Sequence, residues 1–296
     1  MRCVLWRQHR GQLLWTTVVL ALACVAMVVV AHGADHWLAG YQRWLAQLRA
    51  AGCPLPNDGS GVVHAPSAPC RALLARYPGG GQESFVHAYN FAIPVFEEGL
   101  VLLLVLIGVL VGAPLVAREV EQRTQLVAWT QSISRRRWYT TKTAVLGTAL
   151  ALTGLVAGVA NDRVQIPLTR GGLTSSRWPW FFSIDLAPAA EALLAFALAV
   201  AFGAYLRRTL AAVGAALLAF PVLFVVTAWA VRSLTPLSRA SGPRGTPDNA
   251  WLLGGGQYHP AGQYWPLQLT HVAVLLVLSV VLLAAGWRAT RPRSVA

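Results

Sequence analysis

The chain has 296 residues, of which 56% are hydrophobic and 12% are charged, and its formal net charge is +13. Ordinary soluble domains carry about 25% charged residues, so this composition excludes a soluble globular protein. It predicts a polytopic membrane protein, an all-α bundle of helices that crosses a lipid bilayer.

Six apolar segments are about as long as a helix that crosses the roughly 30 Å core of a bilayer. A helix at the surface of a soluble core is usually shorter and keeps one polar face, and none of the six segments has such a face. The sequence therefore predicts six transmembrane helices. They lie at about Leu13–Ala31, Gly99–Ala117, Ala144–Ala160, Ala189–Leu206, Leu210–Val231 and Leu269–Trp287.

The first apolar segment follows three arginines, Arg2, Arg7 and Arg10. This is also the pattern of a cleaved signal peptide. The length of the segment and the five apolar segments after it favour a retained helix.

Residues 32–98 are the longest polar stretch and are expected to form an outer loop. Cys53 and Cys70 lie in it, with Pro, Gly and Ser residues around and between them. In an oxidising compartment, a disulfide between them would stabilise a segment that has little core of its own. The sequence favours this bond over two free thiols.

The basic residues predict the orientation of the chain. If the N-terminus and the C-terminus are cytosolic, the cytosolic parts are 1–12, 118–142, 207–208 and 288–296. These parts hold 14 of the 24 Lys and Arg residues but two of the 11 acids. Cytosolic loops of membrane proteins are enriched in Lys and Arg, and such charge suits anionic lipid headgroups. A high positive charge can indicate nucleic-acid binding, but here we expect contact with the lipid bilayer and none with nucleic acid.

The predicted inner loop, residues 118–142, begins as a helical continuation of the second span. Glu119 and Glu121 are the only acids expected in the cytosol, and the apolar residues Leu126 and Trp129 follow them. A plain basic inner loop needs neither the acids nor the apolar residues. A helix that docks into another protein would use both, so the segment is interpreted as a docking site.

Three acids are expected near the outer ends of the spans. Glu97 and Glu98 precede the second span, and Glu191 is expected in the first turn of the fourth helix. A carboxylate there is favoured by the positive end of the helix and can reach water. Interfacial placement is the simpler interpretation, but together the three acids would ring the outer mouth of the bundle as a candidate outer vestibule.

Two further patterns concern the packing and the last outer loop. Gly108-x-x-x-Gly112 and Gly154-x-x-x-Gly158 place small residues one helical turn apart, which lets helices approach closely. Residues 232–268 are rich in Gly and Pro and are expected to form an irregular outer loop.

Catalytic and cofactor motifs are sparse. No G-x-x-x-x-G-K-[ST] phosphate loop occurs, and the only lysine is Lys142. His32 and His36 could align for a metal ion, but they have no further obvious ligand, so no metal site is predicted. The sequence predicts no enzyme activity and no cofactor in this chain. A membrane-embedded enzyme that uses these two histidines and Glu191 is an alternative.

Three stretches carry a family resemblance. "AREVEQRT" at 117–124 and "AWTQSISR" at 128–135, followed by Lys142, resemble the inner loop of permease subunits of ABC type-2 transporters. "WRQHR" at 6–10 and "YHPAGQYWPLQ" at 258–268 are similar to the start and the last outer loop of a subgroup common in high-GC bacteria. The chain departs from the family at Arg123, where glycine is usual.

The resemblance implies a single transmembrane permease domain over 1–296, with an N-terminal interfacial helix at about 1–12. It implies a second permease chain, identical or different, and a separate ABC ATPase subunit that binds ATP and Mg. The inner loop would be a coupling helix that docks into that ATPase. The implied coupling residues are Arg118, Glu119, Glu121, Thr124, Leu126 and Trp129.

The function expected from this resemblance is that of an exporter permease in a bacterial cell membrane. Its path would be lined by Leu, Ala, Val and Gly, which favours a hydrophobic or amphipathic substrate. The alternative is a non-transporting membrane scaffold or sensor that displays its large outer loop. An ATP-binding-cassette gene beside this one, or a co-purifying ATPase, would separate the two.

Overall fold

The structure is a computed structural model of the chain. It describes residues 39–53, 67–75, 82–122, 134–170, 181–239, 251–254 and 257–290, together with ten residues between 18 and 36. The predicted interfacial helix at 1–12 and most of the predicted first span at 13–31 therefore lie outside the described residues.

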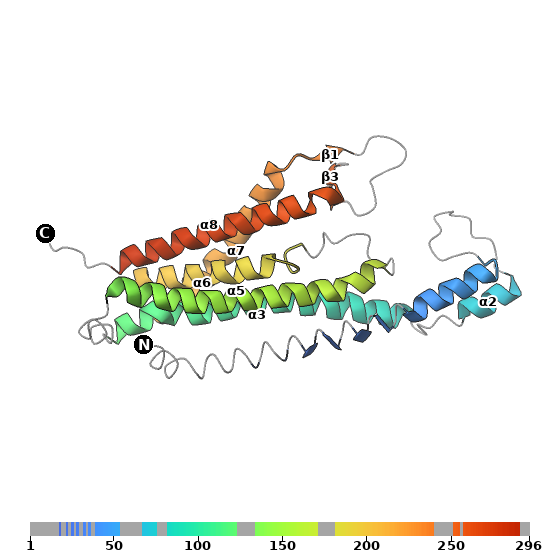
Figure 1. Ribbon diagram of the computed structural model, residues 1–296, viewed down its shortest axis with the longest axis horizontal. Helices are drawn as coiled ribbons and strands as arrows, with labels where there is room; N and C mark the ends of the chain where they lie inside the picture. Colours follow the sequence, from blue (N-terminus) through green and yellow to red (C-terminus); the bar gives the residue numbers. More distant parts are fainter. Residues whose placement is uncertain are drawn as a thin grey trace.

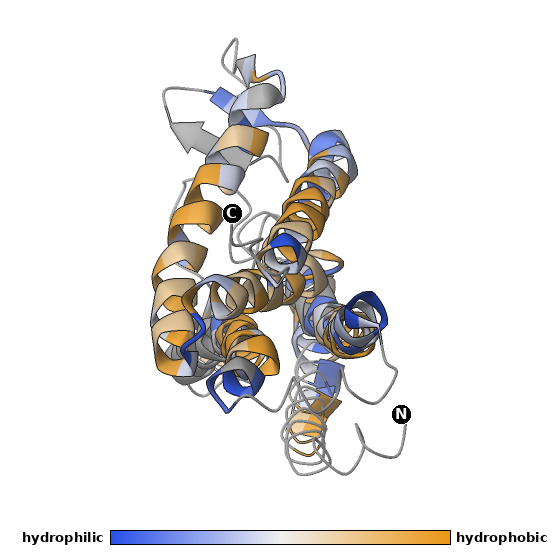
Figure 2. Cartoon of the chain, turned by 90° about the vertical axis from the view of Figure 1, so that its left-hand side faces the viewer, coloured by the Kyte–Doolittle hydropathy of each residue, from blue (hydrophilic) through white to orange (hydrophobic). Residues whose placement is uncertain are grey.

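Five long helices make up the body of the molecule (Figure 1). They are α3 (Gln82–Glu121), α5 (Arg135–Arg170), α6 (Ala187–Leu206), α7 (Thr209–Leu234) and α8 (Tyr264–Ala289). Each contains a stretch that is long and apolar enough to cross a membrane. Hydrophobic residues cover the sides of these helices, and hydrophilic residues gather at their ends (Figure 2). The prediction of an all-α bundle with spans at these five places is confirmed, whereas the sixth span and the orientation stay predictions.

Helix α6 is the centre of the bundle. It contacts α3, α5, α7 and α8, and 72% of the residues in its apolar stretch are buried, against 11% in α7. Large apolar side chains of α7 are exposed instead, among them Leu210, Leu218 and Trp229. An exposed apolar surface of this kind is expected of a helix that faces lipid or another apolar chain.

The glycines of the two predicted motifs lie where α3 and α5 meet α6. A Cβ atom on Gly112 of α3 would lie 2.7 Å from the carbonyl oxygen of Phe196. A Cβ atom on Gly158 would overlap the carbonyl oxygen of Asp185, whose own N–H donates to Gly158 O at 3.2 Å. Only glycine leaves room for backbones this close, so the sequence motifs mark real helix contacts.

The predicted outer loop at 32–98 is largely helical where it is described. Residues 39–50 and α2 (Ala68–Ala75) pack on each other, and α3 begins at Gln82, well before the apolar stretch. Trp44 and Leu48 are buried between the two helices together with the two cysteines. The segment thus has a small core of its own, which the sequence did not indicate.

Three short antiparallel strands connect α7 to α8. They are β1 (Ser238–Arg239), β2 (Trp251–Gly254) and β3 (Gln257–His259), in the order β1-β3-β2, and the 3-10 helix η2 (Ala261–Gln263) leads into α8. The prediction that 232–268 is irregular is therefore wrong for these residues. The sequence did not indicate these strands, because they are too short to show an alternation of polar and apolar residues. Their stability depends on pairing with residues that are distant in sequence.

Candidate functional site

One end of the bundle holds two chain reversals, and we call it the basic end. There α3 ends, α5 begins and α6 turns into α7. The predicted tight turn at 207–208 is confirmed, because Arg207 has a left-handed backbone with φ 56° and Arg208 is extended. The described basic side chains of this end are Arg118, Arg135, Arg136, Arg137, Lys142, Arg207, Arg208 and Arg288.

An ion pair joins α3 to α5 at the basic end. The Nζ atom of Lys142 donates to Oε1 of Glu119, and the two side chains are 8% and 16% exposed. The same ammonium lies 4.8 Å from the centre of the Trp138 ring, which adds a cation–π contact. The only lysine of the chain is thus held by a carboxylate and an aromatic ring in a largely buried position.

A second acid joins α3 to α7. The Oε1 atom of Glu121 accepts a hydrogen bond from the N–H of Thr209 at 3.1 Å, and Oε2 accepts one from Thr209 Oγ1 at 2.9 Å. Thr209 is the first residue of α7, and the first N–H groups of a helix have no partner within it. Glu121 therefore caps α7, and its negative charge lies at the positive end of that helix.

A third connection at this end joins α5 to α8. The hydroxyl of Tyr139 donates to the carbonyl oxygen of Leu283 at 2.7 Å, and its ring lies 5.6 Å from that of Trp287. The basic end thus fastens α3, α5, α7 and α8 to one another through named side chains.

The structure changes the interpretation of the predicted coupling residues. The sequence suggested that Glu119 and Glu121 are free to contact a partner, but both carboxylates are bonded within the chain. Arg118 is exposed next to them. Thr124, Leu126 and Trp129 lie outside the described residues, so their coupling role stays a prediction. The partners Lys142 and Thr209 were missed because they are 23 and 88 residues away from the acids.

The acids of the predicted outer vestibule differ in their surroundings. Glu98 is exposed at the start of the apolar part of α3, and the side chain of Glu97 lies outside the described residues. Glu191 is in the second turn of α6, not the first, and it is 1% exposed. The expectation that it reaches water at the helix end is therefore wrong, because α6 begins two residues earlier than predicted and is surrounded by other helices.

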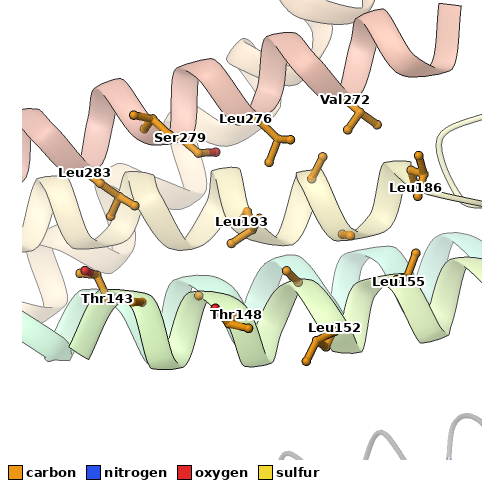
Figure 3. Close-up of a pocket in the computed structure, with 16 residues that line it drawn as sticks. Thr143, Thr148, Leu152, Leu155, Leu186, Leu193, Val272, Leu276, Ser279 and Leu283 are labelled. Atoms are coloured by element: carbon orange, nitrogen blue, oxygen red, sulfur yellow. The ribbon is translucent and has the colours of Figure 1, made fainter. Parts of the chain in front are cut away.

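An apolar cavity of about 490 Å³ lies between α5, α6 and α8. Figure 3 shows Leu276, Ser279 and Leu283 of α8 opposite Leu193 of α6 and Thr148 of α5 around this space. Its walls are almost entirely Leu, Ala, Val and Gly with a few hydroxyl groups. Such a surface suits acyl chains or other apolar groups rather than sugars or ions.

The two outer cysteines lie next to each other. The structure places the sulfur atoms of Cys53 and Cys70 at bonding distance, with their Cα atoms 5.6 Å apart. Trp44 packs beside them, and its indole N–H donates to the carbonyl oxygen of Leu73 at 2.9 Å. The geometry is that of an ordinary disulfide, and the bond itself stays a prediction for chemical analysis.

Metal-ligating side chains are scattered. In the part of the chain that the structure describes, no three His, Cys, Asp or Glu side chains come close enough together to hold a metal ion.

Comparison with protein families gives one match. Residues 59–232 match the model of the family described as ABC-2 membrane transporter related. The chain belongs to this family. Comparisons with curated proteins and with solved structures gave no match. The resemblance to ABC type-2 permeases inferred from the inner loop is thereby confirmed.

The matched part of this ABC-2-related protein runs from the predicted outer loop to the last turn of α7. It includes the basic-end acids, Lys142 and Glu191, whereas α8 lies beyond it. The chain is therefore a multi-pass membrane protein of a transporter family.

Proposed function

We propose that the chain is the transmembrane permease subunit of an ATP-binding-cassette exporter in a bacterial cell membrane. It would move a hydrophobic or amphipathic substrate with energy from ATP hydrolysed on a separate ATPase subunit. The family match, together with five apolar helices, is the observation that carries this proposal. The apolar walls of the cavity in Figure 3 support the substrate class.

The bonds at the basic end suggest how motion would enter the bundle. The segment between Glu121 and Arg135 is proposed to dock into the ATPase. A movement of the ATPase against this segment would displace α3. The ion pair of Glu119 with Lys142 connects α3 to α5, and the hydrogen bonds of Glu121 with Thr209 connect it to α7. A flexible loop would absorb such a motion, whereas a fastened helix end transmits it. The two acids would then act as links within the permease, while Leu126 and Trp129 would contact the ATPase.

A functional unit of this kind is proposed to contain a second permease chain, identical or different. The exposed apolar side of α7 supplies a surface that such a chain, or lipid, would cover.

The experiment co-expresses the tagged chain with the ATP-binding-cassette protein encoded beside it. We expect the ATPase to co-purify and its hydrolysis rate in nanodiscs to change when the permease is present. Trp129→Ala and Leu126→Ala should weaken co-purification several-fold at normal permease abundance, because buried interface side chains carry most of the binding energy. Arg136→Ala, an exposed residue near the same segment, is the matched control and should have little effect. Wild-type co-purification and hydrolysis in both interface variants would refute the coupling role.

One observation favours a second candidate function, a non-transporting scaffold or sensor. The outer helices 39–50 and α2 have a core of their own and could present a binding surface. This alternative predicts that no ATPase co-purifies and that the outer helices alone determine which partner binds.

A further inference from the structure

A second cavity, of about 450 Å³, lies between α3, α6 and α7 and shares no lining residue with the one in Figure 3. Small-molecule sites usually measure roughly 300–1,000 Å³, so it is large enough for a drug-sized molecule. Eleven residues line it, and they include two acids, three phenylalanines and no Lys, Arg or His. The cavity therefore combines acidic side chains with aromatic walls.

The buried acid of this cavity is Glu191. In the described part of the chain, neither of its carboxylate oxygens has a hydrogen-bond partner. The Nε2 atom of His271 lies 3.9 Å from Oε1, which is beyond hydrogen-bond distance. A carboxylate inside an apolar bundle is costly without a compensating charge, and such residues commonly mark binding or transport pathways. Glu191 is 1% exposed, lies beside His271 and is one of the residues that line this cavity.

The aromatic walls suit a positively charged partner. Phe182 and Phe224 meet edge to face with ring centres 5.0 Å apart, and Phe220 stacks on Phe224 at 6.1 Å. The faces of aromatic rings are negative and attract organic cations, most strongly where water is excluded. Three rings, one from the turn before α6 and two from α7, thus line the same cavity as Glu191.

A proline inside α7 contributes to the wall of this cavity. Pro221 lies inside this helix and lines the cavity together with Leu217. Proline has no N–H, so it cannot donate to the carbonyl oxygen of Leu217, four residues earlier. That carbonyl oxygen therefore lacks the donor it would usually have in a helix. Glu98, exposed at the outer start of the span, completes an acidic approach to the cavity.

We propose that this cavity binds lipophilic organic cations, with Glu191 as the counter-charge and the three phenylalanines as the apolar and cation–π surface. A Ca²⁺ or Mg²⁺ ion would need about six or more oxygen ligands, more than the two carboxylates and one hydroxyl among the lining side chains supply. The inference deepens the proposed function by naming a substrate class. It rests on that function for transport, but binding can be measured without any ATPase.

The experiment uses the purified full-length chain in nanodiscs and two probes of the same shape and opposite charge, tetraphenylphosphonium and tetraphenylborate. We expect saturable binding of tetraphenylphosphonium above the level of empty nanodiscs, and no saturable binding of tetraphenylborate. Glu191→Gln should weaken binding of the cation by about tenfold or more, because it removes a buried counter-charge but keeps the shape. Phe224→Leu should weaken it by about threefold through loss of one ring face. Asp162→Asn, which removes an acid outside the cavity, is the control and should leave binding unchanged.

Several results would overturn the proposal. Equal binding of both probes would show that the cavity is an apolar pocket without charge selectivity. Binding of neither probe would show that it is not a binding site for such molecules. Unchanged affinity of the Glu191→Gln variant for the cation would show that Glu191 is not the counter-charge. If that variant does not fold, the comparison of probes on the wild-type chain and the Phe224→Leu variant decide the matter. Absence of cation binding by a chain that does co-purify with the ATPase refutes only the substrate class. Cation binding by a chain with which no ATPase co-purifies supports the site and refutes the exporter.

Discussion

The ion pair between Glu119 and Lys142 offers the sharpest test of how the basic end is held together. Both side chains are largely buried, at 16% and 8% exposure, and no other lysine exists in the chain. Glu119→Gln would leave the ammonium without its counter-charge between α3 and α5. Breaking a fully buried pair costs about 3–5 kcal/mol, and the partial exposure here lowers the expected loss to about 2–4 kcal/mol of unfolding free energy.

Removing both charges together should cost much less than removing one. Replacing a buried pair by uncharged side chains of similar volume is often neutral, so Glu119→Gln with Lys142→Met should lie within about 1 kcal/mol of the wild type. Some of that remainder is the lost cation–π contact with Trp138. If Lys142→Met alone also costs about 2 kcal/mol or more, a double-mutant cycle should give a coupling energy of about 3 kcal/mol or more.

The assay is denaturant unfolding of the purified chain in mixed micelles, followed by tryptophan fluorescence and circular dichroism, with no ATPase present. Glu121→Gln is the control, because an exposed capping carboxylate should cost only about 1 kcal/mol. Additive effects, or a loss below about 0.5 kcal/mol for Glu119→Gln, would show that the pair does not hold α3 to α5. Glu119 would then be available to a partner protein, as the sequence alone suggested.

Three other predictions test the packing, the outer cysteines and the topology. Gly158→Ala should destabilise the chain by about 2 kcal/mol or more in the same assay, because its Cβ would overlap the backbone of Asp185, whereas Gly214→Ala, with nothing within 4 Å, should be neutral or slightly stabilising. Mass spectrometry of non-reduced digests should show the peptides of the two outer cysteines linked; free, alkylatable peptides would contradict the bond. A single cysteine at Ser60, in a cysteine-free background, should react with an impermeant maleimide from outside, and one at Ser132 should not. Labelling of the cysteine at Ser132 from outside would contradict both the predicted orientation and the proposed coupling role of this segment.

The membrane class and the positions of five spans could be predicted from the sequence. Hydropathy summed over about 20 residues is a local property, so span ends such as Leu206 were placed correctly. The two arginines at 207–208 marked the short connection between two spans for the same reason, whereas the left-handed backbone of Arg207 is seen only in the structure. The small residues Gly112 and Gly154 marked close helix contacts, although the sequence did not show that α6 is the helix they contact.

The candidate sites depended on tertiary structure. The sequence identified Glu119, Glu121 and Glu191 as unusual, but it assigned the first two to a partner protein and the third to water. Their surroundings depend on which helices meet in the bundle. Lys142 of α5 lies beside Glu119, the first N–H of α7 lies beside Glu121, and His271 of α8 lies beside Glu191. The apolar character of a helix follows from its own residues alone. The partner of a charge follows from helices distant in sequence, and only the packed bundle determines which of them lies beside it.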